Sequence, residues 1–328
     1  MGTHALTRAS TIGPIADVIE AAGGSVSRVF RSSELPFELV ARPDSFILLS
    51  DQLRLVENAA REIGDDALAA RLSTAGGIAG LGPYGQLVLS FDTLGWAINA
   101  GYQKFASLLQ AATQMDLVVR DGFARWSYRI TAPIIVGRQR NEILAIGYML
   151  NLLRHFAGPR WTPDAILVPG LLQGRGTIED VFAASVTRGE SATVVFPAEL
   201  LDAPNPARRA PPSKPDEEIP GEREFVGIAE HMIRLGLLEG GIGIDQIAAR
   251  LSLSRRTFQR RLAARDVTFE QLADGVRLTQ ARDKLAAGRA ATAIALELGY
   301  SDPAHFSRAF RRWTGETPRR WRVRHTSQ

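Results

Sequence analysis

Three polar side chains, Arg256, Gln259 and Arg260, recur at a spacing that places them on one face of a helix. Arginine can donate two hydrogen bonds to the edge of guanine, and glutamine can form two with adenine. The set therefore has the chemistry to read bases in the major groove of double-stranded DNA. Arg255 adds a fourth polar side chain beside it. The alternative is a charged helix face that contacts solvent.

The segment that carries these residues has the pattern of a helix-turn-helix, and the pattern occurs twice, at 247–262 and 294–310. In such a unit the first helix braces the second, which lies in the major groove. The units are offset by 47 residues at their first isoleucines and by 48 at Phe258 and Phe306, so the second turn should be one residue longer. Two units in tandem favour base reading over a solvated face.

Each unit also has a candidate capping residue and an apolar core. Ser254 should cap the second helix of the first unit, because its hydroxyl can accept a bond from a free amide at the helix start. In the second unit Ser301 or Asp302 can cap, with Pro303 at the first helical position. The apolar side chains that should pack the two helices of the first unit together are Ile247, Ala248, Leu251, Leu253, Phe258 and Leu262.

The second unit offers fewer side chains that can read bases. Its outward positions, all candidates for contact with DNA, are Ala304, His305, Ser307, Arg308, Arg311 and Arg312. Arg308 is the one strong candidate for a base edge, whereas Ala304 can offer only apolar contact with a thymine methyl group. We therefore expect the first unit to dominate specificity and the second mainly to hold phosphates.

Charge is unevenly divided along the chain. The net charge is +4, but residues 221–328 carry 19 basic and 12 acidic side chains, whereas residues 1–220 carry 20 and 23. A basic part beside a neutral-to-acidic part is typical of a DNA-binding module joined to a partner domain.

Seven prolines between positions 197 and 220 predict a break between domains, because proline removes backbone donors and ends helices and central strands. We expect an effector-sensing or dimerisation domain over 1–202, an exposed proline-rich linker over 203–221, and a DNA-binding domain over 222–328. The fold class predicted by residue periodicity is α/β (or α+β) before the linker and all-α after it.

Some elements can be predicted individually. Residues 114–120 and 123–130 should form a hairpin across Asp121-Gly122. A long helix over 269–287 should join the two helix-turn-helix units as a rigid rod. Further helices are predicted at about 12–22, after a cap at Asp51, after a cap at Thr93, and over 139–156, with strands at 165–168 and 192–196.

The amino-terminal part shows no motif typical of an enzyme. It has no Gly-x-Ser-x-Gly, phosphate loop or paired histidines, and the glycine-rich stretch 76–82 lacks the context of a dinucleotide site, so we expect a flexible turn there. With no cysteine and five scattered histidines, neither a metal site nor a cofactor is expected. No apolar run could cross a bilayer and no signal peptide is evident, so we expect a cytoplasmic protein that binds no membrane.

Two groups of residues could bind a small-molecule effector. Arg138 and Arg140 open a predicted helix and could hold a carboxylate or phosphate, or could simply lie on the surface. Five aromatic residues could line an apolar pocket, although core packing would explain them as well: Trp96, Tyr102, Phe105, Trp126 and Tyr128. The identity of the effector is left open.

The carboxy-terminal part, about 222–324, resembles the AraC/XylS family of bacterial transcription regulators. The most diagnostic segment, 294–318, reads IALELGYSDPAHFSRAFRRWTGETP and is followed by Trp321-Arg322. The resemblance implies that each monomer places two recognition helices in successive major-groove turns. Asp266 stands where the family commonly has glycine, and aspartate tolerates left-handed backbone geometry. The positions that match the family's base-contacting residues are Arg256, Gln259 and Arg260, then Pro303, Ala304, Ser307 and Arg308.

The amino-terminal part resembles the arabinose-binding-like effector domain of one branch of this family. The resemblance is carried by LGPYG at 81–85, TLGWA at 93–97, the helix over 142–156 and WTP at 161–163. It implies an inducer-sensing or dimerising role and does not imply arabinose as the ligand. The expected partners are promoter DNA, an unidentified effector, a second copy of the chain and RNA polymerase. The alternative is a constitutive or architectural DNA-binding protein whose front domain only dimerises.

Overall fold

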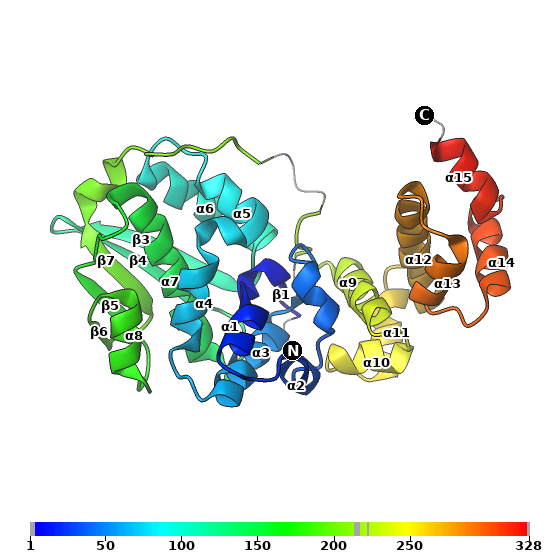
Figure 1. Ribbon diagram of the computed structural model, residues 1–328, viewed down its shortest axis with the longest axis horizontal. Coiled ribbons are helices and arrows are strands. Elements are labelled where there is room, and N and C mark those ends of the chain that lie inside the picture. Colours follow the sequence, from blue (N-terminus) through cyan, green and yellow to red (C-terminus); the bar gives the residue numbers. More distant parts are fainter. Residues whose placement is uncertain (1–3, 213–216, 222, 327–328) are drawn as a thin grey trace. The chain divides into compact units, whose positions relative to one another are not determined.

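The computed structural model describes residues 4–212, 217–221 and 223–326, and the chain divides into two compact units, 1–222 and 223–328. Figure 1 shows strands and helices in the first unit and helices in the described part of the second, which confirms the predicted fold class. Parts of two expectations lie outside the described residues: 213–216 of the proline-rich segment, and Glu222, where the last domain was expected to begin.

The first unit is built on a five-stranded sheet with the order β3-β4-β7-β5-β6. Its strands are β3 (Thr113–Arg120), β4 (Phe123–Ile130), β5 (Ala165–Val168), β6 (Val186–Arg188) and β7 (Ala192–Pro197). β3 and β4 form the expected hairpin, and Asp121 and Gly122 at its turn have φ values of 53° and 80°. Positive φ at both central residues is what a type I′ turn requires. Only β5 and β6 pair in parallel within this sheet.

Helix α7 (Arg138–Ala157) packs on β4, β5 and β7, across one face of the sheet. Burial alternates along β4: Ala124, Trp126, Tyr128 and Ile130 are buried, whereas Phe123, Arg125 and Arg129 are exposed. Alternation of this kind is typical of a strand with one face on the core and the other in solvent. The helix-covered face therefore holds the core of this unit.

The remaining helices of the first unit complete the layer beside the sheet. They are α1 (Ile15–Ala21), α2 (Val26–Ser32), α3 (Leu49–Ile63), α4 (Leu68–Gly76), α5 (Gly82–Val88), α6 (Leu94–Leu108) and α8 (Arg175–Phe182), together with a short pair of strands, β1 (Leu6–Arg8) and β2 (Phe46–Leu48). The cap at Thr93 is confirmed, because its side chain accepts a backbone N–H bond at the start of α6.

Three local predictions in this unit were wrong. The helix expected over 12–22 is interrupted at Gly13, whose φ of 54° is not helical, so α1 starts at Ile15. Asp51 does not cap α3, which begins two residues earlier; it is buried and pairs with Arg54 at 2.5 Å. The glycine-rich stretch 76–82 is not a flexible turn: it includes the end of α4, a 3-10 helix and the start of α5.

The proline-rich segment has no helix in its described part after residue 202, as expected, but it is not fully exposed. Arg208 pairs with Asp92 at 2.8 Å, and the buried Arg8 donates a hydrogen bond to the Glu217 carbonyl at 3.0 Å. Ile219 is buried as well. The expectation of an exposed linker is therefore met at Arg208 and Glu217 and wrong at Ile219, which packs on the first unit.

The second unit consists of seven helices in the part that the structure describes. They are α9 (Phe225–Leu238), α10 (Ile244–Arg250), α11 (Arg255–Ala263), α12 (Phe269–Ala286), α13 (Ala291–Glu297), α14 (Pro303–Thr314) and α15 (Pro318–Thr326). Thr268 and Gln271 form a capping box that fixes the start of α12. This helix contacts α9 as well as α13 and α15, as expected of a rod between the two helix-turn-helix units. Among the described helices of the chain, none is long and apolar enough to span a membrane.

Candidate DNA interface and ligand pocket

The first helix-turn-helix, α10 and α11, has the predicted core and cap. Ser254 accepts a hydrogen bond from the Thr257 amide at 3.2 Å, which confirms it as the cap of α11. Leu253 was predicted to be a core residue, but it is only half-buried. The other predicted core residues are at most 1% exposed: Ile247, Ala248, Leu251, Phe258 and Leu262. This packing fixes the direction in which the other face of α11 points.

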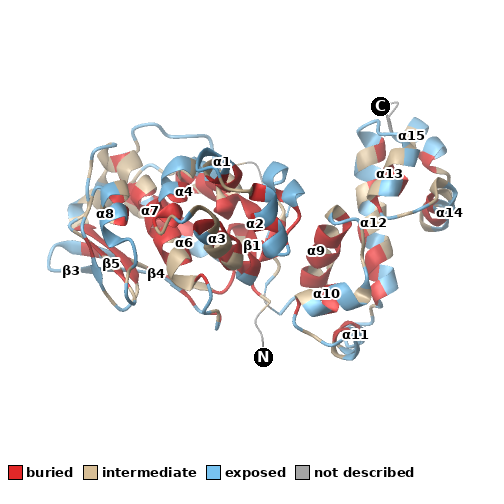
Figure 2. Cartoon of the chain, turned by 60° about the horizontal axis from the view of Figure 1, so that its bottom comes forward, coloured by how far each residue is buried: buried red, intermediate tan, exposed pale blue. Residues whose placement is uncertain are grey.

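That face of α11 is polar and exposed (Figure 2). Arg255 pairs with Asp245 of α10 at 3.2 Å. Within the described residues, Arg256, Gln259 and Arg260 have no hydrogen-bond or ion-pair partner, although all three are long polar side chains at i, i+3 and i+4. Their donors can therefore meet a ligand without first breaking an internal contact.

The second helix-turn-helix, α13 and α14, repeats the scaffold. Asp302 caps α14 by accepting a bond from the Ala304 amide at 2.8 Å, and Pro303 occupies the first turn, as predicted. Phe306 and Phe310 are fully buried. Five residues separate α13 from α14 against four between α10 and α11, which confirms the longer second turn.

The outward face of α14 differs from that of α11. Ala304, His305, Arg308 and Arg311 are exposed, and Ser307 is half-buried. Two side chains further along the helix contact one carboxylate of α12: Arg312 lies 2.9 Å from Asp274, and the Trp313 indole donates to it at 3.0 Å. Arg308 and Arg311 are the basic residues of this face without an internal ion pair in the described chain.

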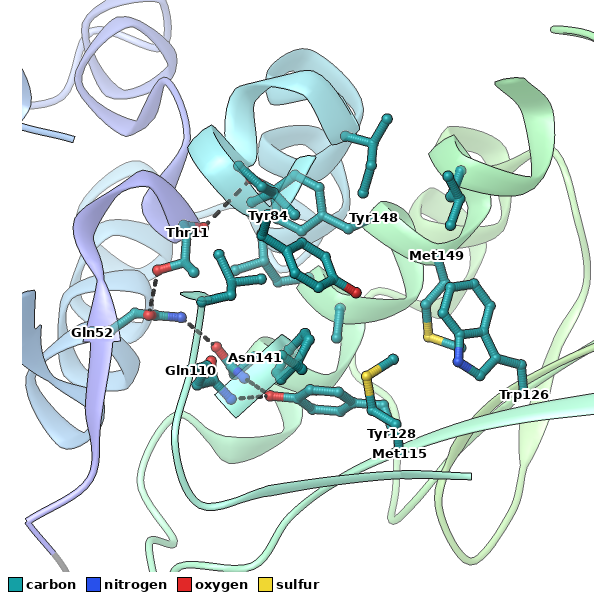
Figure 3. A pocket seen from close by; sticks show the side chains of 17 residues that line it. Thr11, Gln52, Tyr84, Gln110, Met115, Trp126, Tyr128, Asn141, Tyr148 and Met149 are labelled. Carbon is teal, nitrogen blue, oxygen red and sulfur yellow. Dashed lines mark hydrogen bonds between the residues drawn. The ribbon is translucent and has the colours of Figure 1, made fainter. Parts of the chain in front are cut away.

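The first unit contains a cavity between α5, α6, α7 and the β3–β4 hairpin (Figure 3). None of its 17 lining side chains is charged. The apolar ones are Ile78, Leu81, Phe105, Leu109, Met115, Trp126, Leu144, Ala145, Met149 and Leu152, and the polar ones are Thr11, Gln52, Tyr84, Gln110, Tyr128, Asn141 and Tyr148. A mostly apolar cavity with a few convergent polar groups is typical of a small-molecule site.

Five of the polar lining residues form one chain of hydrogen bonds along a wall of the cavity (Figure 3). Thr11 donates to Gln52 at 2.5 Å, and Gln52 donates to Asn141 at 2.7 Å. The Tyr128 hydroxyl accepts from Asn141 at 2.9 Å and from Gln110 at 2.5 Å. Burial raises the pKa of Tyr128 to about 12, so its hydroxyl stays protonated at neutral pH. This wall is therefore rigid and uncharged.

The other two tyrosines are less well paired. Tyr148 donates to the Thr11 carbonyl at 3.4 Å, which is long for a hydroxyl donor. Tyr84 has ring contacts, but its hydroxyl has no hydrogen-bond partner among the described residues, and Figure 3 shows it turned toward the cavity. Burial raises the pKa of both phenols, so both are neutral. An unpaired buried hydroxyl can bond a ligand that enters the cavity.

Of the five aromatic residues expected to line a pocket, three do so. Phe105, Trp126 and Tyr128 line the cavity. Trp96 and Tyr102 do not: they are 63% and 56% exposed on the solvent side of α6, because the buried stripe of that helix runs through other positions. These two expectations are corrected.

The two arginines expected to hold an anion, Arg138 and Arg140, are both ion-paired within the first unit. Arg138 lies 3.3 Å from the Glu142 carboxylate. Arg140 lies 2.8 Å from Glu57 and 2.9 Å from Asp66. Both guanidinium groups are therefore already paired with carboxylates of the same unit, and an anionic effector would have to compete with these contacts.

Sequence reasoning missed most of the polar lining. Gln52, Gln110 and Asn141 are buried and come from α3, the segment after α6, and α7. A signal was present at Gln110, an amide within the apolar run Leu-Leu-Gln-Ala-Ala. A buried amide needs partners, so such a residue indicates either a ligand site or an internal network.

Tandem helix-turn-helix units with exposed basic side chains, preceded by a separate α/β unit with an internal cavity, define a two-domain DNA-binding transcription regulator. A family model described as the arabinose-binding domain of AraC transcription regulators matches residues 23–205, and a helix-turn-helix domain model matches residues 247–324. The chain belongs to the AraC/XylS family of transcription regulators.

Relatives match along nearly the whole chain. The transcriptional regulator VirS of Mycobacterium tuberculosis is 25% identical over 339 aligned residues, 98% of each chain. The ornithine utilization regulator of Pseudomonas aeruginosa is 27% identical over 319 residues, 93% of each chain. The crystal structure of the regulator CdpR from Pseudomonas aeruginosa is 17% identical and covers 79% of this chain and 87% of that one, with a TM-score of 0.37.

Proposed function

We propose that this regulator reads its operator mainly through α11, with Arg256, Gln259 and Arg260 on base edges. The observation that carries the assignment is that these side chains share one exposed face and have no partner in the described chain. Arginine and glutamine are the residues best suited to bidentate bonds with guanine and adenine. Arg255, already paired with Asp245, fits a supporting contact to phosphate.

The test is a gel-shift titration of the full chain on its operator. Arg256→Ala should cost about 1–3 kcal/mol of affinity and relax the preference for one base pair. Arg282→Ala is the matched control, since Arg282 is also exposed but lies on α12. An unchanged base preference in Arg256→Ala would exclude the assignment.

For α14 we propose a role that is mainly anchoring. Arg308 is its candidate for a base edge, and Ala304 offers an apolar contact. Arg311 and Arg312 fit phosphate contacts, with His305 and Ser307 as further polar neighbours. This proposal is supported by the small number of long side chains on this face that lack an internal partner. Arg312, for example, is paired with Asp274.

We further propose that the cavity of the first unit binds the effector, and that the effector is a neutral, mostly apolar molecule with one or a few polar atoms. An uncharged lining cannot compensate a ligand charge that loses its water. The cavity volume is about 50 Å³, which is smaller than the ~150 Å³ of an engineered cavity that holds benzene, so the walls must move to admit a ligand of that size. Met115 and Met149 line it, and their flexible side chains can move to admit a ligand.

Thermal unfolding tests this site. Among small neutral aromatic and aliphatic compounds, one that binds the native state should raise the melting temperature of the wild-type chain. Ala145→Leu narrows the cavity and should abolish the shift, whereas Ala106→Leu, the same change at an exposed position of α6, should preserve it. A shift that persists in Ala145→Leu would place the ligand elsewhere. No shift with any compound would favour the constitutive alternative, in which the front domain only dimerises.

The proposal includes a homodimer on paired operator sites, because two-fold protein symmetry commonly matches paired half-sites. RNA polymerase is a further proposed partner. In this scheme the first unit binds a ligand and performs no catalysis. Because the target is promoter DNA, the expected compartment is the cytoplasm.

A further inference from the structure

Strand β3 leaves one edge of the five-stranded sheet open. β4 is its neighbour on one side, and no strand pairs with its other side in the described chain. Just before β3 that edge is covered, because Ala111 donates to the Leu6 carbonyl at 2.9 Å and the chain of β1 runs alongside. The cover ends there. From Asp116 to Arg120 every residue of β3 is exposed, as the pale colour of this strand in Figure 2 shows.

An open edge of this kind is a template for another strand. Natural proteins usually protect such edges with charged side chains, especially lysine, with proline or with a bulge. β3 contains neither lysine nor proline, and its register with β4 is continuous over all eight residues, so it has no bulge. It exposes Leu117, Val118 and Val119 in succession. The charges on its exposed part, Asp116 and Arg120, have opposite signs and so would not repel a second copy of the strand.

The sequence of β3 is complementary to itself in one antiparallel register. If Val118 faces Val118 of a second copy, Asp116 lies opposite the partner's Arg120, and Arg120 lies opposite the partner's Asp116. Leu117 then faces the partner's Val119. Opposite charges and apolar pairs directly across two strands are stabilising. A shift by one residue separates both charge pairs, so the complementarity selects this register.

The charges are available for that exchange. Within one copy Asp116 accepts a hydrogen bond from Gln114 at 3.1 Å, and Arg120 lies 3.4 Å from Asp121. All these contacts are at the surface, where an ion pair or hydrogen bond contributes little and can be replaced.

We propose that β3 pairs antiparallel with β3 of a second copy, on a two-fold axis through Val118, joining two five-stranded sheets into one. The inference rests on the proposed homodimer and names its surface. An isologous contact of this kind uses the same residues on both copies and closes at two, which limits assembly to a dimer.

Cysteine cross-linking tests the register directly, because the chain has no cysteine of its own. In the proposed pair the two copies of residue 118 are about 4.5–5.5 Å apart at Cα, within reach of a disulfide. The two copies of residue 119 are diagonal neighbours at about 7–8 Å, which is too far. Val118→Cys should form a covalent dimer on mild oxidation, and Val119→Cys, equally exposed at 54%, should do so at least about tenfold more slowly.

Charge reversal provides the second arm, measured by sedimentation equilibrium of the full chain. Asp116→Arg and Arg120→Asp should each weaken the dimer about tenfold, because each places like charges opposite at two points, and the double variant should restore it. A wild-type chain that stays monomeric overturns both the homodimer and this surface. A dimer in which Val118→Cys does not cross-link, or in which the double reversal does not restore affinity, overturns the surface and leaves the homodimer standing.

Discussion

The two helix-turn-helix units share an interior and differ on their surfaces. Phe258 and Phe306 occupy equivalent positions and are both fully buried. Outside, Arg256 of α11 corresponds to Ala304 of α14, and Gln259 corresponds to Ser307. A repeated pattern therefore specifies two copies of a scaffold, while a few exposed positions decide what each copy can contact.

The largest expected effect tests whether the interiors are equivalent. Phe258→Ala and Phe306→Ala should each lower the free energy of unfolding of the second unit by about 3–5 kcal/mol, because each removes a fully buried ring and leaves a cavity. Urea unfolding followed by far-ultraviolet circular dichroism measures both. A loss in one variant that exceeds the other by more than about 2 kcal/mol would show that the two cores are not equivalent.

The next prediction concerns the corresponding surface positions. Gln259→Ala should remove about 1–3 kcal/mol of discrimination at one base pair, whereas Ser307→Ala should change discrimination by less than about 1 kcal/mol. The difference follows from the reach of an amide that can form two bonds with adenine. Competition binding against randomised operator sequences measures it, and equal losses would remove the proposed asymmetry.

A third prediction separates anchoring from reading. Arg311→Ala should weaken binding to all sequences alike and reduce the salt slope of log affinity by about 1, since one phosphate contact is lost. Titrations at several salt concentrations, on specific and unrelated DNA, measure this. A loss confined to the operator would instead assign Arg311 to base contact.

The smallest effect concerns the turns. Ser252 in the turn of the first helix-turn-helix has a φ of 53°, and the corresponding residue of the second helix-turn-helix is Gly299, with a φ of 79°. Left-handed geometry strains a residue with a Cβ, so Ser252→Gly should stabilise the unit by about 0.5–1 kcal/mol and Gly299→Ser should destabilise it by a similar amount. A Cβ at Gly299 would meet only the Gly240 carbonyl oxygen at 3.9 Å, an ordinary contact, so the effect would come from the backbone. Opposite signs in thermal unfolding support this account, and equal signs contradict it.

The sequence predicted the second unit better than the first. The helices of both helix-turn-helix units and the long helix α12 were expected, because the helix-turn-helix pattern repeats and the caps Ser254 and Asp302 mark helix starts. The left-handed backbone expected at Asp266 is confirmed by its φ of 55°. Local patterns of this kind need no knowledge of distant contacts.

The first unit was predicted less completely because its site depends on contacts between distant segments. The hairpin β3–β4 and α7 were expected, but the short elements α2, β1 and β2 were not. The hydrogen-bonded wall joins Thr11, Gln52 and Asn141, which lie far apart in the chain. Aromatic character alone pointed to Trp96, although the helix turns that side chain to solvent.

The length of helix α12 limits how the spacing within the operator of this regulator can change. It is attached to both halves of the second unit: the ring of Phe269 packs edge-on against Phe258 at 6.1 Å, and Lys284 pairs with Glu297. One added residue in α12 would rotate α13 and α14 by about 100° and advance them by about 1.5 Å. If α11 and α14 contact DNA as proposed, the length of α12 therefore sets the distance between their two contact sites on the operator. This distance can change only by about one helical turn of α12 at a time. The spacing between the two contact sites in a new promoter must therefore match the protein.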